Sequence, residues 1–308
     1  MRVCGERITP VAIPSKTWGI AEYRGNVIAC ADPSNIWKHN GRYYMQTGNL
    51  LVLDKYGREA DSPQDMRGDW TELFSSDDLR LWKWEGRFYD RSNCETHPDD
   101  SEDDMCPSFL PLPTSKEGGM LTDEYLQLFI SHNRGCQYYI GRLEEETFIP
   151  RLHGRMSWID SAFFAPEAYI DDKGRQIAFS WLRDNLPNDY SRFGWSGVMS
   201  LPRLLWRHDD GTLGIAPASE IDELAYNTKI YDHALLASLS SIPVATPDRC
   251  RIHWVAANQK NATGIRIQNE KQHIDIICDP SNGKLILDAS ESGSECGAVI
   301  EGCSIFLV

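Results

Sequence analysis

The chain has 308 residues, enough for one large domain and part of another, and 41% of them are hydrophobic and 25% charged, as in an ordinary globular protein. The net charge of −14 comes without a basic stripe, which argues against nucleic acid or an anionic membrane as a partner. No apolar run approaches the roughly 20 residues that span a bilayer.

The first predicted elements are short β-strands joined by tight turns. An Asn40-Gly41 turn joins residues 35–37 to residues 42–45, which is typical of a β-hairpin. Residues 72–74 and 81–84 flank an acidic turn in the same way.

The same arrangement continues along the chain. Residues 125–131 turn at 133–135 into residues 136–141, and residues 168–170 turn at 171–174 into residues 176–182. Few stretches show helical periodicity, so the sequence predicts an all-β protein with hairpins at propeller-like intervals.

The composition changes near Ala225. Beyond it, Trp becomes scarce and alternating aliphatic runs dominate, for example at residues 265–267, 274–276 and 284–287. We therefore expect two domains, residues 1–224 and residues 225–308, the second with sandwich-like strands.

Three stretches carry a family resemblance. Residues 194–203 read Gly-Trp-Ser-Gly-Val-Met-Ser-Leu-Pro-Arg and lead to Asp210-Gly211. Residues 163–167 read Phe-Phe-Ala-Pro-Glu, and residues 106–112 read Cys-Pro-Ser-Phe-Leu-Pro-Leu. In this order and spacing they resemble glycoside hydrolase family 32, the invertase, levanase and inulinase group.

The resemblance implies a five-bladed β-propeller, here with its first blade incomplete or missing, followed by part of a C-terminal β-sandwich. It also implies a retaining mechanism with three acidic residues. One carboxylate attacks the anomeric carbon, a second protonates the leaving oxygen and later activates water, and a third stabilises the transition state. No metal and no cofactor are implied, and the nine Cys lack metal-type pair spacing.

Asp32 is the expected transition-state stabiliser, because Ala31-Asp32-Pro33 resembles the family's Arg-Asp-Pro motif with Ala31 in place of the Arg. Asp32-Pro33-Ser34-Asn35 also resembles the motif that carries the nucleophile, but only about seventy residues then separate it from Cys106. With Asp32 as stabiliser, the nucleophile motif is missing, and we expect a chain truncated at both ends.

The family's acid/base residue is also replaced in this chain. The family has a Glu directly before Cys-Pro, where this chain has Met105. Three acids stand just upstream, Glu102, Asp103 and Asp104, and we expect Asp103 or Asp104 to transfer the proton. Strand alternation points Asp103 to the side of Met105, and Asp104 away from it unless a bulge intervenes.

Sugar contacts are expected from three residues that match family positions. Cys106 and Phe164 match residues that line the fructose site, and Trp181 matches a Trp near the leaving-group sugar. Glu167 replaces a Gln of the family and is expected to form pocket wall.

The expected function is hydrolysis of fructosyl bonds in sucrose or fructans. The alternatives are a non-catalytic sugar-binding propeller of the same family, a fructosyl transferase or, more distantly, an arabinan-cleaving enzyme. The expected partner is a sugar that contains fructose, with no nucleic acid and no membrane. Residues 1–10 lack the apolar stretch of a signal peptide, so we expect a cytoplasmic location.

Overall fold

The computed structural model describes residues 20–23, 26–29, 31–33, 35–48, 70–89, 94, 104–131, 135–156, 163–183, 194–230, 252, 254, 260–268, 273–288 and 297–300. Within 20–33 and 297–300 it describes the backbone alone. The chain divides into two units, Met1–Ser219 and Glu220–Val308. The domain boundary expected at residue 224 stays a prediction.

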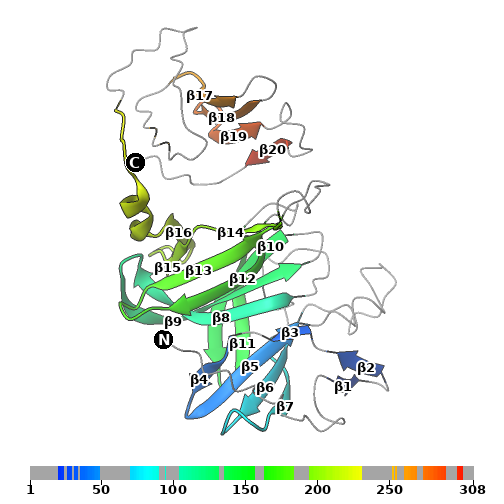
Figure 1. Cartoon of the computed structure of the whole chain (residues 1–308). Helices are drawn as coiled ribbons and strands as arrows, with labels where there is room; N and C mark the ends of the chain where they lie inside the picture. Colours follow the sequence, from blue (N-terminus) through cyan, green and yellow to red (C-terminus); the bar gives the residue numbers. More distant parts are fainter. Residues whose placement is uncertain are drawn as a thin grey trace. The chain divides into compact units, whose positions relative to one another are not determined.

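The first large sheet of unit 1 has the strand order β3-β5-β6-β7, and the short strand β4 also pairs with β5 (Figure 1). Its strands are β3 (Ala31–Pro33), β4 (Trp37–His39), β5 (Arg42–Gly48), β6 (Glu72–Ser76) and β7 (Lys83–Arg87). Asn40 (φ 46) and Gly41 (φ 85) have the two positive φ angles of a type I′ turn, which confirms the predicted hairpin.

The second sheet has the order β11-β10-β9-β8, with every neighbouring pair antiparallel. Its strands are β8 (Met105–Ser115), β9 (Gly118–Ser131), β10 (Gly135–Glu144) and β11 (Thr147–Arg155). Consecutive strands pair as in an up-and-down meander, which is the topology of a propeller blade.

The third sheet has the order β12-β13-β15-β16, and β14 pairs with β13. Its strands are β12 (Phe163–Ile170), β13 (Gln176–Leu182), β14 (Val198–Met199), β15 (Arg203–Arg207) and β16 (Leu213–Pro217). A short 3-10 helix, η4 (Ser219–Leu224), follows. The three sheets confirm the all-β, propeller-type fold, and a further pair, β1 (Ile20–Tyr23) with β2 (Asn26–Ala29), precedes them.

Apolar side chains fill the spaces between the sheets. A cluster of aromatic rings from the first and second sheets includes Phe88, Phe109, Tyr139 and Phe148, each no more than 1% exposed. A second cluster joins residues of the second sheet, such as Leu128, to residues of the third. Full burial of one such side chain contributes about 1.5–3 kcal/mol, so these clusters hold neighbouring blades face to face.

Three polar ties also join the blades. Gln46 of β5 and Gln127 of β9 exchange two amide hydrogen bonds, of 2.7 and 2.9 Å, and both residues are fully buried. Glu124 of β9, itself buried, pairs with Arg207 of β15 and, at 2.9 Å, with Arg151 of β11. The third tie centres on Arg42, which lies near Glu146 of the β10–β11 turn.

Unit 2 contains one described antiparallel sheet of order β17-β18-β19-β20. Its strands are β17 (Thr263–Gln268), β18 (His273–Asp279), β19 (Lys284–Asp288) and β20 (Gly297–Ile300). They confirm the alternating aliphatic runs as strands. In the part of the chain that the structure describes, no helix is long and apolar enough to cross a membrane.

Candidate active site

Three of the motifs singled out in the sequence lie on strands that each form the edge of a sheet. These strands are β3, β8 and β12, and β8 lies beside both β3 and β12. The Asp32 motif, the Cys-Pro motif and the Phe-Phe-Ala-Pro-Glu motif are therefore brought to neighbouring strands, although more than 130 residues separate Asp32 from Glu167.

Each of the three edge strands is bulged within its motif. The register shifts between Ala31 and Pro33 in β3, between Met105 and Ser108 in β8, and between Phe164 and Glu167 in β12. Bulges concentrate next to active sites, where they redirect side chains.

Two of the bulges contain a non-glycine residue with positive φ. These are Cys106 at 47° and Ala165 at 48°, a backbone region that costs L-residues energy and clusters at functional sites. Asp104, directly before β8, also has a positive φ, of 50°. The backbone is therefore strained at both motifs for which side chains are described.

The predicted acids occupy different surroundings. Asp32 lies in the bulge of β3, where the structure describes its backbone only. Asp103 and Glu102 lie outside the described residues. Asp104 is 1% exposed and both of its carboxyl oxygens are buried, so they are closed to solvent. The assignment of Asp32, Asp103 and Asp104 as catalytic stays a prediction.

The predicted sugar-contacting residues meet around one apolar cluster. Met105 and Phe164 are buried members of this cluster, and Cys106 is half-buried against it. Phe164 meets the indole of Trp181 edge-on, with ring centroids 6.1 Å apart. Trp181 is 40% exposed, so part of its side chain is open to a sugar ring.

Gly197 explains part of the Gly-Trp-Ser-Gly motif. It has φ +66, and a Cβ atom added there would lie 1.9 Å from Nε1 of Trp181. Only a glycine allows the backbone to pass so close to the indole, and the motif thereby fixes the position of Trp181. Arg183 adds a guanidinium 4.8 Å from the ring centre of Phe164.

Glu167 reaches from β12 to β8. The hydroxyl of Ser108 donates a long hydrogen bond of 3.4 Å to Oε1 of Glu167 and accepts one of 3.2 Å from the backbone N–H of Ala168. Desolvation by burial raises the pKa of Glu167 to about 7, whereas the hydrogen bonds from Ser108 and from the N–H of Ala168 lower it. Glu167 is nevertheless exposed as a whole residue, so a ligand can reach it.

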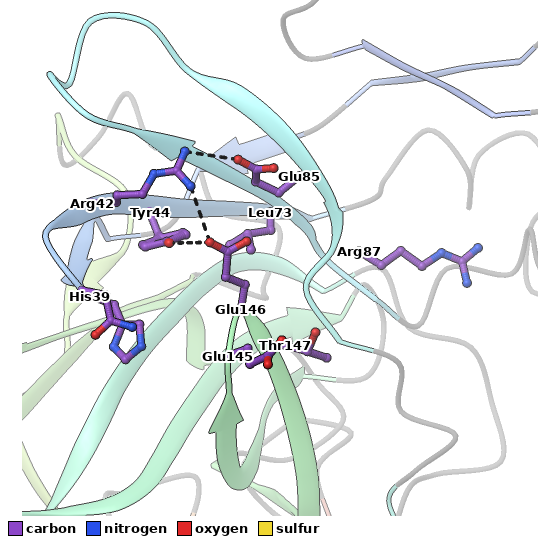
Figure 2. A pocket seen from close by; sticks show the side chains of 10 residues that line it. His39, Arg42, Tyr44, Leu73, Glu85, Arg87, Glu145, Glu146 and Thr147 are labelled. Carbon is purple, nitrogen blue, oxygen red and sulfur yellow. Dashed lines mark hydrogen bonds and ion pairs between the residues drawn. The ribbon is translucent and has the colours of Figure 1, made fainter.

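A pocket of about 550 Å³ lies elsewhere, between the first and second sheets (Figure 2). Arg42 and Tyr44 of β5, Glu85 of β7 and Glu146 of the β10–β11 turn are among its lining residues, and none of the motif residues is. The pocket is therefore distinct from the edge strands.

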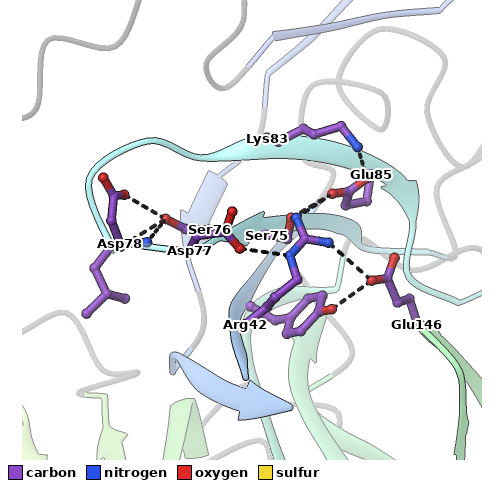
Figure 3. A network of polar contacts seen from close by, with 10 residues as sticks. Arg42, Ser75, Ser76, Asp77, Asp78, Lys83, Glu85 and Glu146 are labelled. Atoms are coloured by element: carbon purple, nitrogen blue, oxygen red, sulfur yellow. Dashed lines mark hydrogen bonds and ion pairs between the residues drawn. The ribbon is translucent and has the colours of Figure 1, made fainter. Parts of the chain in front are cut away.

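Ion pairs and hydrogen bonds occupy this pocket (Figure 3). Arg42 lies 3.4 Å from Glu85 and 3.5 Å from Glu146, and the Tyr44 hydroxyl donates a 2.7 Å hydrogen bond to Glu146. Burial, and then the contact with Glu146, raise the pKa of Tyr44 to about 12. This network ties two blades together, and we assign it a structural role. Among the described residues no group of His, Cys, Asp and Glu could hold a metal ion.

Blade-type antiparallel sheets with bulged edge strands side by side, two of which carry an acid, fit the class of propeller glycosidases. Residues 19–217 match the family described as glycosyl hydrolases family 32, N-terminal domain. The chain belongs to this family.

Relatives with established names agree with this assignment. A fructan 1-exohydrolase of Triticum urartu is 29% identical over 213 residues, which cover 64% of this chain and 34% of that protein. A sucrose-6-phosphate hydrolase of Bacillus subtilis is 25% identical over 238 residues, which cover 72% of this chain and 44% of that protein. The chain thus spans less than half the length of these two relatives.

Solved structures show the same fold. A family 32 beta-fructofuranosidase of Bombyx mori is similar with a TM-score of 0.58 and 18% identity, covering 97% of this chain and 58% of that one. The sucrose-6-phosphate hydrolase of Lactobacillus gasseri gives a TM-score of 0.52 and 19% identity, covering 86% of this chain and 51% of that one.

Two residues at the site have contacts that the sequence alone does not reveal. Ser108 belongs to the Cys-Pro motif, but its contact with Glu167 spans 59 residues. Arg183 follows Trp181 without belonging to any motif. The one available signal was an acid at position 167 in place of an amide.

Proposed function

We propose that the protein hydrolyses fructosyl bonds in sucrose or fructans by a retaining carboxylate mechanism. The observation that carries this proposal is the convergence of three family motifs on the bulged edge strands β3, β8 and β12. The printed names of the relatives, fructan exohydrolase and sucrose-6-phosphate hydrolase, support fructosides as the substrate class.

In this proposal Asp32 stabilises the positive charge that develops on the fructosyl ring. Cys106 and Phe164 line the fructose site, and Trp181 contacts the leaving-group sugar. Asp103 and Asp104 are the acids that the Cys-Pro motif suggests for proton transfer. No residue of the chain is assigned here as nucleophile. The cytoplasmic location and the absence of nucleic-acid and membrane partners stay predictions.

The test is an assay of the chain with sucrose, inulin and levan, in which released fructose is measured. Release that falls at least about 100-fold in Asp32→Asn supports the proposal, because the variant keeps the shape of the side chain and loses its charge. Longer oligosaccharides as the main product would indicate a fructosyl transferase. Sugar binding by calorimetry without release of fructose would indicate a non-catalytic propeller and would refute hydrolysis.

A further inference from the structure

We propose that Glu167 is the proton donor of the reaction and takes over the role that Met105 cannot perform. This inference rests on the proposed function, because it assigns one step of fructoside cleavage. It replaces the expectation that Asp103 or Asp104 transfers the proton, and it also revises the expectation that Glu167 forms pocket wall.

The register of β12 places Glu167 on the sugar face. Phe164 pairs with Trp181, and Glu167 pairs with Phe179, which lies two residues before Trp181 on β13. Residues two apart on a strand point to the same face, and directly paired residues share that face. The bulge at Ala165 therefore turns Glu167 to the face that carries the proposed sugar-contacting rings.

The register of β8 places Ser108 on the same face as Met105. Met105 pairs with Ile130 and Ser108 with Leu128, so the bulge at Cys106 turns Met105 and Ser108 to one face. Three residues apart, they would otherwise face opposite ways. Because Ser108 donates its hydrogen bond to Glu167, the Glu167 carboxyl meets β8 on the face where the family carries its acid.

One of the two competing acids, Asp104, is less accessible. Both carboxyl oxygens of Asp104 are buried, whereas Glu167 is exposed and can meet a glycosidic oxygen. The Ser108 hydroxyl accepts the N–H of Ala168 and donates to Oε1 of Glu167, which orients this oxygen, and Oε2 can hold the proton.

The chemistry follows the retaining scheme. Glu167 passes its proton to the glycosidic oxygen while the bond from this oxygen to the anomeric carbon breaks and its electron pair goes to the oxygen. A carboxylate nucleophile binds the anomeric carbon. Water then displaces that carboxylate, adds its hydroxyl to the anomeric carbon and returns its proton to Glu167. An acid that is still protonated near neutral pH suits this role.

Other titratable groups lie on strands next to Glu167 and have to be considered when the pH dependence of the rate is interpreted. Asp104 precedes β8, and the thiol of Cys106 lies within it. Cys136 lies on β10 and is buried, which raises its pKa far above the neutral range. Arg203 on β15 is half-buried and stays cationic.

The test uses Glu167→Gln in the full chain with sucrose, and Glu117→Gln on the exposed β8–β9 turn as the matched control. We expect kcat to fall by about 100-fold or more in Glu167→Gln with little change in KM, and no change in the control. The loss should be smaller on an aryl fructoside, whose leaving group needs no proton, and added azide should restore part of the rate.

A second variant keeps the assignment testable if Glu167→Gln folds poorly. Ser108→Ala removes a hydrogen bond that lowers the pKa of Glu167, so the alkaline limb of the rate profile should move to higher pH. An active wild type with unchanged rates in Glu167→Gln, or a loss confined to Asp104→Asn, overturns the Glu167 assignment alone. A wild type that cleaves no fructoside overturns the proposed function with it.

Discussion

The buried amide pair between the first two sheets allows a quantitative prediction. Gln127→Leu removes both hydrogen bonds to Gln46, of 2.7 and 2.9 Å, and leaves the buried Gln46 amide N–H group without the acceptor that it has in Gln127. Two lost hydrogen bonds at about 1 kcal/mol each, and a buried donor at about 1–3 kcal/mol, give a loss of roughly 3–5 kcal/mol in the free energy of unfolding. Thr71 still donates to Oε1 of Gln46, which limits the loss.

The assay is thermal unfolding followed by Trp fluorescence, because nine of the ten Trp residues lie in unit 1. A unit of this size loses about 2–4 °C per kcal/mol, so the midpoint should fall by roughly 6–20 °C. Gln268→Leu, the same change at an exposed position of β17, should shift it hardly at all.

A double variant sharpens the test. When Gln46→Leu is combined with Gln127→Leu, neither amide is left buried without its partner, so the loss should be clearly smaller than the sum of the single losses. Additive losses, or a Gln127→Leu effect no larger than that of the exposed control, would refute the reasoning.

Further outcomes follow from other contacts. Glu124→Gln should lower the free energy of unfolding, measured in urea melts, by about 1–3 kcal/mol. This loss is smaller than for a fully buried ion pair, because the two Arg partners of Glu124 are partly exposed. An unchanged urea midpoint would contradict this expectation. The folded-state pKa of Glu167, about 7, lies above its ordinary value of 4.5, so the folded state binds the proton more tightly and loses stability as pH rises from 4.5 through 7. Glu167→Gln should therefore unfold at a higher temperature than wild type at pH 8 but not at pH 4; equal shifts at both would contradict the raised pKa. Gly197→Ala should displace Trp181 and weaken sugar binding measured by fluorescence, whereas Gly194→Ala, with φ +71 and no atom within 4 Å of an added Cβ, should cost stability alone.

Local patterns in the sequence predicted the strands well. The Asn40-Gly41 turn, the acidic turn after β6 and the alternation in β17 to β19 each depend on residues close together in the chain, and the structure has a strand on either side of each turn. Hairpins are local structures, so their signals survive without any knowledge of the rest of the fold.

The bulges could not be predicted in this way. Strand alternation would set Met105 and Ser108 on opposite faces, but the shift at Cys106 brings them to the same face. Neither Cys106 nor Ala165 is a residue type that normally adopts positive φ, so their identity does not predict the bulges. Glu167 then acquires its partner from a different sheet, a contact that the order of residues along β12 cannot reveal.

The polar ties between blades affect the order in which the chain folds as it is synthesised. Each hairpin can close over a few residues, but Gln46 meets Gln127 across 81 positions and Tyr44 meets Glu146 across 102. A ribosome must therefore deliver the second sheet before the first can complete its polar contacts. We expect the first sheet to remain loosely ordered in the nascent chain. It should become protease-resistant only when the β10–β11 turn has left the exit tunnel.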